Sequence, residues 1–473
     1  MDDGKAIDCG GCCRRECRMT KPAPTLRAVA REEATDRRPP AYSDDALALD
    51  FAERHAAELR YVAAWGKWLR WDGHRWDVDS TLQSFDMARK LCREAAATCN
   101  EPRISKAIVS APTVAAVERL ARSDRRLAAT ADVWDTDPWV LNTPDGVIDL
   151  RTGETRPAVP EDHVTKITAA GVGGGCRVWR QFLYRITEGD EDLELFLQRM
   201  CGYALTGSTR DQALFFLFGR GANGKSVFTS TIANVIGDYY RAAPIETFTV
   251  STMERHPTDL AGLRGARLVS AVETEEGRAW AESRIKMLTG GDVVSARGMR
   301  QDFFDYTPQF KLLIVGNHRP SLRSVDEAIR RRFHLVPFSL TIPAAERDHK
   351  LMEKLKLEWP GILGWMVEGA LAWQREGLAP PQAVVRATAE YLAAEDSFGS
   401  WIETECDRDP AASTKATVLF ALWKQWSEDA GERCGSMKSF AAALQGRGFA
   451  SRHTRNGNVY DGIAPGKKDE QKQ

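Results

Sequence analysis

The sequence has no long apolar run and no apolar leader, and each absence excludes a class of protein. No stretch approaches the roughly 18 consecutive apolar residues that a membrane-spanning helix requires. Residues 1–42 are polar and charged, without the apolar segment of a secretory signal. We therefore expect a cytoplasmic protein that has no membrane partner.

The chain also lacks an excess of charge of either sign. Its 65 Lys and Arg residues are balanced by 66 Asp and Glu residues, which leaves a formal net charge of −1. This balance excludes a globally basic nucleic-acid-binding protein, so any contact with DNA must come from local basic patches. A length of 473 residues is enough for about three domains with a substantial core.

Cysteine is too sparse for a disulfide scaffold, because six of the ten cysteines are scattered singly. The other four, Cys9, Cys12, Cys13 and Cys17, lie close together. Zinc sites built from two cysteine pairs need a longer spacer than this cluster offers. Residues 1–42 are rich in Arg, Glu, Pro and Ala, so we expect a disordered tail, with a metal site as the alternative.

What the sequence does contain is a phosphate-binding loop, in the stretch FFLFGRGANGKSVFTS over residues 215–230. It matches the pattern G-x-x-x-x-G-K-[ST], and a strand-like apolar run precedes it while a helix-compatible run follows. In such a loop backbone N–H groups wrap a triphosphate, Lys225 neutralises β- and γ-phosphate oxygens, and Ser226 binds Mg²⁺. The residues expected to bind nucleotide are Gly219, Gly221, Ala222, Asn223, Gly224, Lys225, Ser226 and Val227.

Two more apolar runs end in polar side chains. Residues 266–272 lead to Glu273 and Glu275, and residues 310–315 lead to Asn317. A carboxylate at the tip of a strand next to the phosphate-loop strand holds the hydration shell of Mg²⁺ or orients the attacking water. An amide in the position of Asn317 hydrogen-bonds the γ-phosphate or that water. A solvated acidic loop is the alternative for the two glutamates.

Three consecutive arginines, residues 330–332, stand before a last apolar run. Such a group is often a solvated face. In a ring-shaped ATPase one of them instead reaches the γ-phosphate bound by the neighbouring subunit, a contact worth about 10³ to 10⁵ in rate.

The regions on either side of this core have other sequence patterns. Residues 61–78 alternate aromatic and polar residues around an Asp-Gly turn, which predicts a β-hairpin. Its tryptophans supply packing in the simplest interpretation, with stacking on nucleobases as the alternative. Near the C-terminus, helical patterns at 415–430 and 436–446 and an alternation at 451–463 predict a winged helix-turn-helix. Local basic residues there suit DNA, and protein docking is the alternative.

Five motifs in order, GRGANGKS, LVSAVETEEG, KMLTGGDVVSAR, FKLLIVGNHRP and DEAIRRRFHLVPF, resemble the superfamily 3 helicase domain of the phage/plasmid primase family, which includes the poxvirus-type primase-helicases. Upstream, GKWLRWDGHRW, LNTPDGVIDLRTGE and LQRMCGYALTG resemble that family's accessory domain. The resemblance implies an α/β fold: a P-loop, AAA+-like core with a mostly helical N-terminal accessory domain and a C-terminal winged helix. The expected divisions are a tail at 1–42, the accessory domain at 43–190, the ATPase domain at 191–380 and the winged helix at 397–465.

The resemblance also implies roles by position. Glu273 corresponds to the Walker B carboxylate, which holds Mg²⁺ together with Ser226, and Asn317 corresponds to sensor 1. Arg331 or Arg332 corresponds to the finger that acts across the subunit interface. The family forms hexameric rings with DNA in the channel.

In that family the loop between the Walker B and sensor strands is a hairpin that projects into the pore. Arg297, Arg300 and Lys311 are therefore implied DNA contacts, with surface ion pairs as the alternative. The 42 residues ahead of the accessory region are too few for a primase domain, so we expect a motor without primase and a separate primase as partner.

The sequence thus predicts an ATP-dependent, Mg²⁺-dependent DNA helicase for replication of a phage, prophage or plasmid, acting on single-stranded or forked DNA as a homohexamer. The alternative from another class is a replication initiator whose nucleotide only switches DNA binding, without strand separation. A small-molecule P-loop kinase fits less well, because it needs a substrate lid while this chain carries a ring-type sensor and finger.

Overall fold

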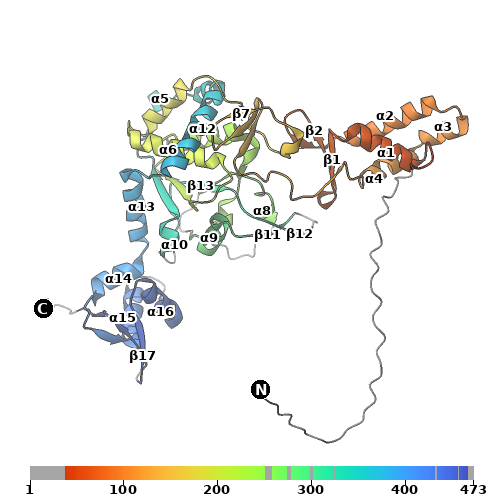
Figure 1. Ribbon diagram of the computed structural model, residues 1–473. Coiled ribbons are helices and arrows are strands. Elements are labelled where there is room, and N and C mark those ends of the chain that lie inside the picture. The colour runs from red at the N-terminus through yellow and green to blue at the C-terminus, as the bar shows by residue number, and fades with distance from the viewer. Residues whose placement is uncertain are drawn as a thin grey trace, which may run out of the picture.

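The computed structural model describes residues 38–250, 258–273, 278–298, 302–322, 325–431, 434–455 and 457–466. Figure 1 shows a central α/β body with helices α1 to α4 at one end and helices α14 to α16 at another. Within those ranges no helix combines the length and apolar character needed to cross a membrane. The cysteine cluster at residues 9–17 and residues 1–37 of the expected tail lie outside the described residues.

The N-terminal end combines four helices with a small sheet. The helices are α1 (Asp44–His55), α2 (Gln83–Thr98), α3 (Pro102–Ile108) and α4 (Ala111–Ala121). The sheet has the order β3-β2-β1-β4, from β1 (Leu59–Val62), β2 (Lys67–Trp71), β3 (Trp76–Val78) and β4 (Ala128–Ala129), with η1 (Ala63–Trp65) after β1. β2 and β3 form the expected hairpin, in which Trp71 pairs with Trp76. Trp68 and Trp76 are buried, which favours packing over base stacking for these two.

A second antiparallel sheet leads into the central body. It consists of β5 (Val140–Thr143), β6 (Gly146–Asp149) and β7 (Thr155–Arg156), followed by η2 (Pro160–Asp162). Tyr239 of the central body donates its hydroxyl to the carbonyl of Lys166, and the same hydroxyl accepts from the N–H of Asn142 (3.0 Å). The accessory region thus contains two small sheets besides the helices that the sequence predicts.

The central sheet is parallel throughout, in the order β14-β8-β13-β10-β9. Its strands are β8 (Leu214–Phe218), β9 (Tyr240–Ala242), β10 (Leu268–Glu273), β13 (Lys311–Gly316) and β14 (Phe333–Pro337). All six residues of β13 and four of the five in β8 are buried. Strands that are covered on both faces read as continuous apolar runs, which is why the sequence reveals them.

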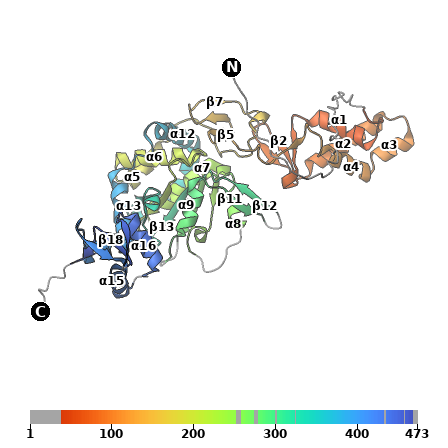
Figure 2. The same cartoon turned by 60° about the horizontal axis from the view of Figure 1, so that its bottom comes forward.

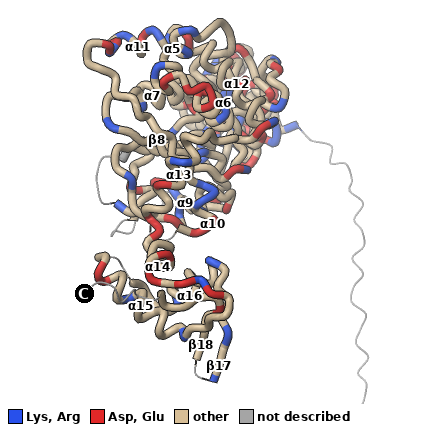
Figure 3. Tube along the Cα trace, turned by 90° about the vertical axis from the view of Figure 1, so that its left-hand side faces the viewer, with Lys and Arg blue, Asp and Glu red and all other residues tan. Residues whose placement is uncertain are grey.

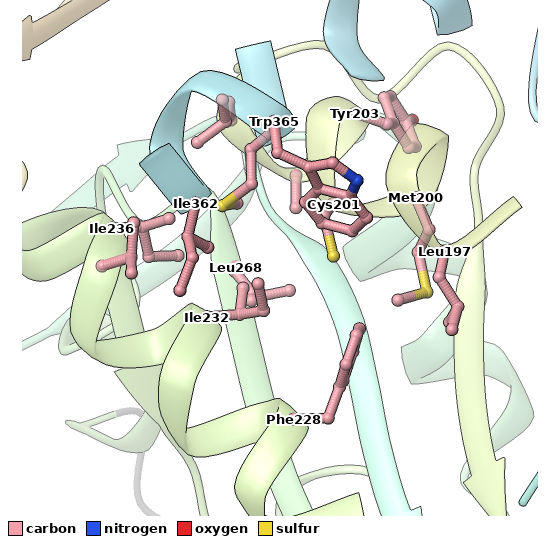
Figure 4. Close-up of a cluster of buried hydrophobic side chains, with 14 of the residues drawn as sticks. Leu197, Met200, Cys201, Tyr203, Phe228, Ile232, Ile236, Leu268, Ile362 and Trp365 are labelled. Carbon is pink, nitrogen blue, oxygen red and sulfur yellow. The ribbon is translucent and has the colours of Figure 1, made fainter. Parts of the chain in front are cut away.

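Helices cover both faces of this sheet (Figures 1 and 2). One face carries α5 (Arg177–Ile186), α6 (Glu191–Leu205), α7 (Lys225–Ile236), α11 (Leu351–Leu357) and α12 (Trp359–Glu376). Figure 4 shows how α6, α7 and α12 converge there through Met200, Phe228, Ile232 and Trp365. The other face carries α9 (Glu282–Gly290), α10 (Glu327–Arg330) and the hairpin of β11 (Val294–Arg297) and β12 (Phe303–Tyr306). The remaining short elements are η3 (Gly237–Tyr239), η4 (Ile245–Thr247), α8 (Thr258–Ala261) and η5 (Ala344–Glu346).

Helix α13 (Gln382–Ala394) closes the open edge of the sheet at β14. The Thr388 hydroxyl accepts a hydrogen bond from the Leu335 N–H (2.9 Å), which satisfies a donor that an edge strand would otherwise expose. On the other side of β13, β10 pairs with β13 and with the edge strand β9 and does not touch β8. The expectation that Glu273 ends a strand next to the phosphate-loop strand is therefore wrong, because β13 lies between them.

The C-terminal part has its own core. Helices α14 (Ser397–Glu405), α15 (Ala416–Asp429) and α16 (Met437–Gly446) enclose Trp401, Leu419 and Phe440. Strands β16 (Ser413–Lys415), β17 (Ser451–Thr454) and β18 (Gly457–Asp461) form an antiparallel sheet, and β15 (Cys406–Asp407) pairs with β19 (Ala464–Pro465). Helices α15 and α16 lie where the sequence predicts them.

Candidate functional site

The loop between β8 and α7 is shaped by two glycines. Gly224 has φ 88° and directly precedes α7, and a Cβ there would lie 2.6 Å from Ile186 Cγ2. A Cβ on Gly219 would lie 2.1 Å from the Phe338 carbonyl oxygen. No other residue type fits either position without displacing its neighbours. The tight turn places the N–H groups of the first turn of α7 at the carboxyl edge of the sheet, where an anion is favoured.

The side chain of Lys225 lies inside this loop, with an exposed fraction of 6 %. Its Nζ donates to the Gly219 carbonyl, to Asn223 Oδ1 (3.2 Å) and to Asn317 Oδ1 (3.1 Å). Burial lowers the pKa of this ammonium below its ordinary value. A bound phosphate would bring negative charge to this buried cation and replace neutral oxygens as its partners.

The strand order explains why Asn317 reaches that lysine. Because β13 lies directly beside β8, the residue that follows β13 meets the loop that follows β8. The amide of Asn223, in turn, donates to the Phe338 carbonyl (3.0 Å), which ties the loop to the segment after β14. Three predicted site residues, Lys225, Asn223 and Asn317, are thus in direct contact.

The predicted Mg²⁺ ligands lie at the same edge. Ser226 is exposed in the first turn of α7, and Glu273 is the last residue of β10, paired with Gly316 of β13. Glu275 lies outside the described residues. The described part of the chain contains no group of three or more His, Cys, Asp or Glu residues that would hold a metal by itself. Mg²⁺ is commonly held by one or two carboxylates together with substrate phosphates, and this donor set fits that arrangement.

The three arginines have different surroundings. Arg332 is 4 % exposed, and its guanidinium donates to Thr289 Oγ1 (3.1 Å) and to the Ala328 carbonyl (2.7 Å). Arg330 pairs with Asp396 (3.2 Å). Arg331 is exposed, and its side chain has no hydrogen bond or ion pair with a described residue. The expectation for Arg332 is therefore corrected: it fastens α10 to α9, and Arg331 is left as the outward-facing candidate.

Lys311 is also not where the sequence places it. Its exposed fraction is 1 %, and its Nζ donates to the carbonyls of Thr206, Ser208 (3.3 Å) and Gln309 (3.3 Å). Burial lowers the pKa of this ammonium well below its ordinary value. The prediction that Lys311 contacts DNA is wrong, because its cation caps carbonyls just beyond the C-terminus of α6.

The β11–β12 hairpin does present a basic side chain. Arg297 pairs with Phe303 across the strands, and its guanidinium carbon lies 4.9 Å from the Phe303 ring centroid. Phe303 is 59 % exposed, which is unusual for a phenylalanine. Arg300 lies outside the described residues. Arg264 also contacts the hairpin, since its guanidinium carbon lies 5.3 Å from the Phe304 ring centroid.

The sequence reasoning missed two exposed groups, Phe303 on the hairpin and Arg319 after Asn317. Both stand close to motifs that it recognised. Their side-chain exposure, which sequence alone does not give, is what distinguishes them from the core aromatic residues and paired arginines around them.

Comparison with known proteins gives two family matches. Residues 48–188 match the family described as D5 N terminal like, and residues 217–332 match a family of unknown function, DUF5906. The second match covers the phosphate loop, the hairpin and the arginines. It adds no function to them.

Several viral proteins are similar in sequence. A putative helicase of Acanthamoeba polyphaga mimivirus is 25 % identical over 293 residues, which are 57 % of this chain and 30 % of that protein. A putative helicase of Invertebrate iridescent virus 6 is 29 % identical over 237 residues, 47 % of this chain and 24 % of that protein. The chain therefore spans less than a third of the length of these relatives.

Among solved structures, the apo structure of the NrS-1 C terminal region (305-718) covers 90 % of this chain and all of its own, with a TM-score of 0.50 and 9 % identity. At this identity the likeness concerns the fold alone. In sequence the chain thus contains a region that matches the D5 N terminal like family and is similar to viral putative helicases. In fold it is similar to the NrS-1 C terminal region.

Proposed function

We propose that the chain is an ATP-dependent DNA helicase for replication of a phage, prophage or plasmid, with a P-loop, AAA+-like superfamily 3 core that works as a hexameric ring. The observation that carries this proposal is the contact between Lys225 and Asn317 (3.1 Å) at the common carboxyl edge of β8 and β13. A lysine that neutralises phosphates and an amide that orients water or the γ-phosphate are the parts that nucleotide hydrolysis needs in one place.

In this proposal each residue of the nucleotide site has its own role. Lys225 exchanges its loop oxygens for phosphate oxygens, and Asn317 is then released to contact the γ-phosphate or the attacking water. Glu273 orients that water, and Glu275 lies close by in the sequence. Mg²⁺, held by Ser226, Glu273 and the nucleotide, would neutralise charge on the β- and γ-phosphates.

Completion of the site requires a second chain. Arg331 is exposed and directly follows α10, a helix on the face of the sheet opposite α7, so we assign it as the finger that reaches the nucleotide of a neighbouring subunit. This assignment supports a homohexamer, because a site shared between identical chains closes naturally into a ring.

The DNA partner is assigned from two surfaces. On the hairpin, Arg297 supplies charge for phosphates and Phe303 supplies an aromatic face, a combination that suits single-stranded DNA without sequence preference. On the C-terminal part, Figure 3 shows basic residues on the β17–β18 hairpin, which carries Arg452 and Arg455. The three-helix arrangement with an antiparallel sheet supports a winged helix, with β17 and β18 as its wing.

The core clusters support a division into an accessory region from residue 43, an ATPase region to about residue 380 and a winged helix at 397–465. Leu141, Ile148 and Trp179 belong to the same cluster as α6 and α12. In packing terms, residues 141–186 of the proposed accessory region therefore share the core of the ATPase region. A separate primase and a cytoplasmic location remain part of the proposal.

The second candidate, an initiator in which nucleotide only switches DNA binding, is favoured by one observation. Asp396 joins Arg330 of α10 to Arg447 of the C-terminal part, so the arginine segment and a DNA-binding unit are physically connected. Such a connection suits a switch as well as a motor.

The test is ATP hydrolysis with and without single-stranded DNA, together with displacement of a labelled strand from a forked duplex. Lys225→Ala, which removes the proposed phosphate-binding lysine, is the negative control. Hydrolysis stimulated by DNA, with displacement, is the expected result for the helicase. Nucleotide-dependent DNA binding without displacement would instead support the initiator.

A further inference from the structure

Arg319 is a cationic side chain at the edge of the phosphate loop that the proposed function does not use. It follows Asn317 by two residues, where the chain leaves β13. Its guanidinium carbon lies 4.1 Å from the centroid of the Phe218 ring and 5.9 Å from that of Tyr391. Phe218 directly precedes Gly219, so Arg319 and the loop lie at the same edge of the sheet.

The backbone next to Arg319 is firmly held. The Tyr391 hydroxyl donates to the Pro320 carbonyl, and the backbone N–H of Trp280 donates to the Ser321 carbonyl (2.9 Å). Arg319 itself is exposed, and its side chain has no hydrogen bond or ion pair with any described residue. The backbone at Arg319 is held in place, and its guanidinium lies on aromatic rings with its N–H donors unsatisfied. Arg319 is therefore preorganised to contact an anion.

The nearest anion in the proposed cycle is the nucleotide. Asn317 already bonds Lys225 Nζ, the group expected to neutralise the β- and γ-phosphates, so the segment that carries Arg319 meets the phosphate end of the site. We propose that Arg319 is a second cationic contact to the nucleotide of its own chain, that it binds the terminal phosphate, and that it thereby makes the site prefer ATP over ADP. This rests on the proposed nucleotide site.

The experiment is equilibrium titration of the full chain with a fluorescent non-hydrolysable ATP analogue and with the matching ADP analogue, both with Mg²⁺. Arg319→Ala is expected to weaken the triphosphate about tenfold or more, since a charge-assisted hydrogen bond is lost, and to change ADP affinity by less than about twofold. Arg319→Lys keeps the charge without the bidentate geometry and is expected to fall between Arg319→Ala and the unaltered chain.

Arg241→Ala is the matched control, because Arg241 is an exposed arginine on β9, at the far edge of the same sheet. Equal losses for both analogues, or no loss, would overturn the proposal. So would loss of single-stranded DNA binding with unchanged nucleotide affinity, which would make Arg319 a DNA contact. Recovery of triphosphate preference on mixing with Lys225→Ala chains would overturn the assignment to its own chain.

The proposed nucleotide site fails in a different way. If the unaltered chain and Lys225→Ala bind the triphosphate equally weakly, the site itself is wrong. If only Lys225→Ala loses binding and Arg319→Ala keeps the ATP preference, the site stands and the role of Arg319 is rejected.

Discussion

At the scale of single residues, burial changes the chemistry of His334 most clearly. This histidine on β14 stacks on Phe215 at 5.4 Å between ring centroids. Burial lowers its pKa from 6.5 to about 4, although Asp211 acts weakly in the opposite direction. In the unfolded chain this histidine therefore becomes protonated near pH 6.5, whereas in the folded chain it becomes protonated only near pH 4. Stability from this residue is complete above pH 6.5 and is lost as the pH falls toward 4.

We predict that the unaltered chain loses about 2 kcal/mol of unfolding free energy through His334 between pH 7.5 and pH 5. His334→Phe keeps an aromatic ring without the titrating group. Its loss of unfolding free energy between the two pH values is therefore expected to be smaller by that amount. Urea unfolding at the two pH values measures the difference. His453→Gln, at an exposed histidine of the C-terminal part, serves as the control and should follow the unaltered chain. If His334→Phe lost as much unfolding free energy between pH 7.5 and pH 5 as the unaltered chain, the prediction would be contradicted.

At the scale of elements, the junction between α13 and α14 connects separate parts of the molecule. The Asp396 carboxylate caps α14 by accepting from the Gly399 N–H (2.9 Å), and it also pairs with Arg330 of α10 and Arg447 of the segment after α16. Asn also caps helices well but carries no charge. Asp396→Asn therefore separates the two roles.

We predict that Asp396→Asn speeds hydrogen exchange in α10 and α16 about fivefold, which corresponds to about 1 kcal/mol for the lost ion pairs. Amides in the first turn of α14 should change less, because the cap remains. Glu390→Gln, an exposed carboxylate on α13 that pairs with Arg386 at 3.8 Å, is the matched control. Faster exchange confined to α14 would show that the carboxylate acts only as a cap.

The elements also show what sequence can and cannot predict here. The strands of the central sheet were predictable because burial on both faces leaves an unbroken apolar run, as in Leu214–Phe218. Their order was not, because crossover connections place β13 between β8 and β10. Lys311 looked like a free cation because its carbonyl partner at Thr206 lies 105 residues away along the chain. Arg331 and Arg332 are equivalent in sequence, and only the packing of α10 on α9 separates them.

At the scale of the whole molecule, the proposal depends on a site shared between chains. In the proposal, Lys225 contacts the nucleotide of its own chain, whereas Arg331 contacts that of a neighbour. Lys225→Ala and Arg331→Ala should each abolish hydrolysis when alone. Mixed rings would contain interfaces that combine an intact Lys225 from one chain with an intact Arg331 from the next.

We therefore predict that mixing the two inactive variants in equal amounts restores hydrolysis. Random assembly makes about a quarter of interfaces complete, so recovery of up to about a quarter of the unaltered rate is expected if interfaces act independently, and less if the ring acts as a unit. The control is Arg347→Ala mixed with Lys225→Ala, because Arg347 is an exposed arginine after η5 whose guanidinium donates to the Ile342 carbonyl (3.0 Å). In this mixture Lys225→Ala chains should only dilute or poison the active ones. Full activity of Arg331→Ala alone would contradict the shared site. Absence of recovery in rings shown by labelling to contain both chains would contradict it as well, because every closed ring that contains both variants has at least one complete site.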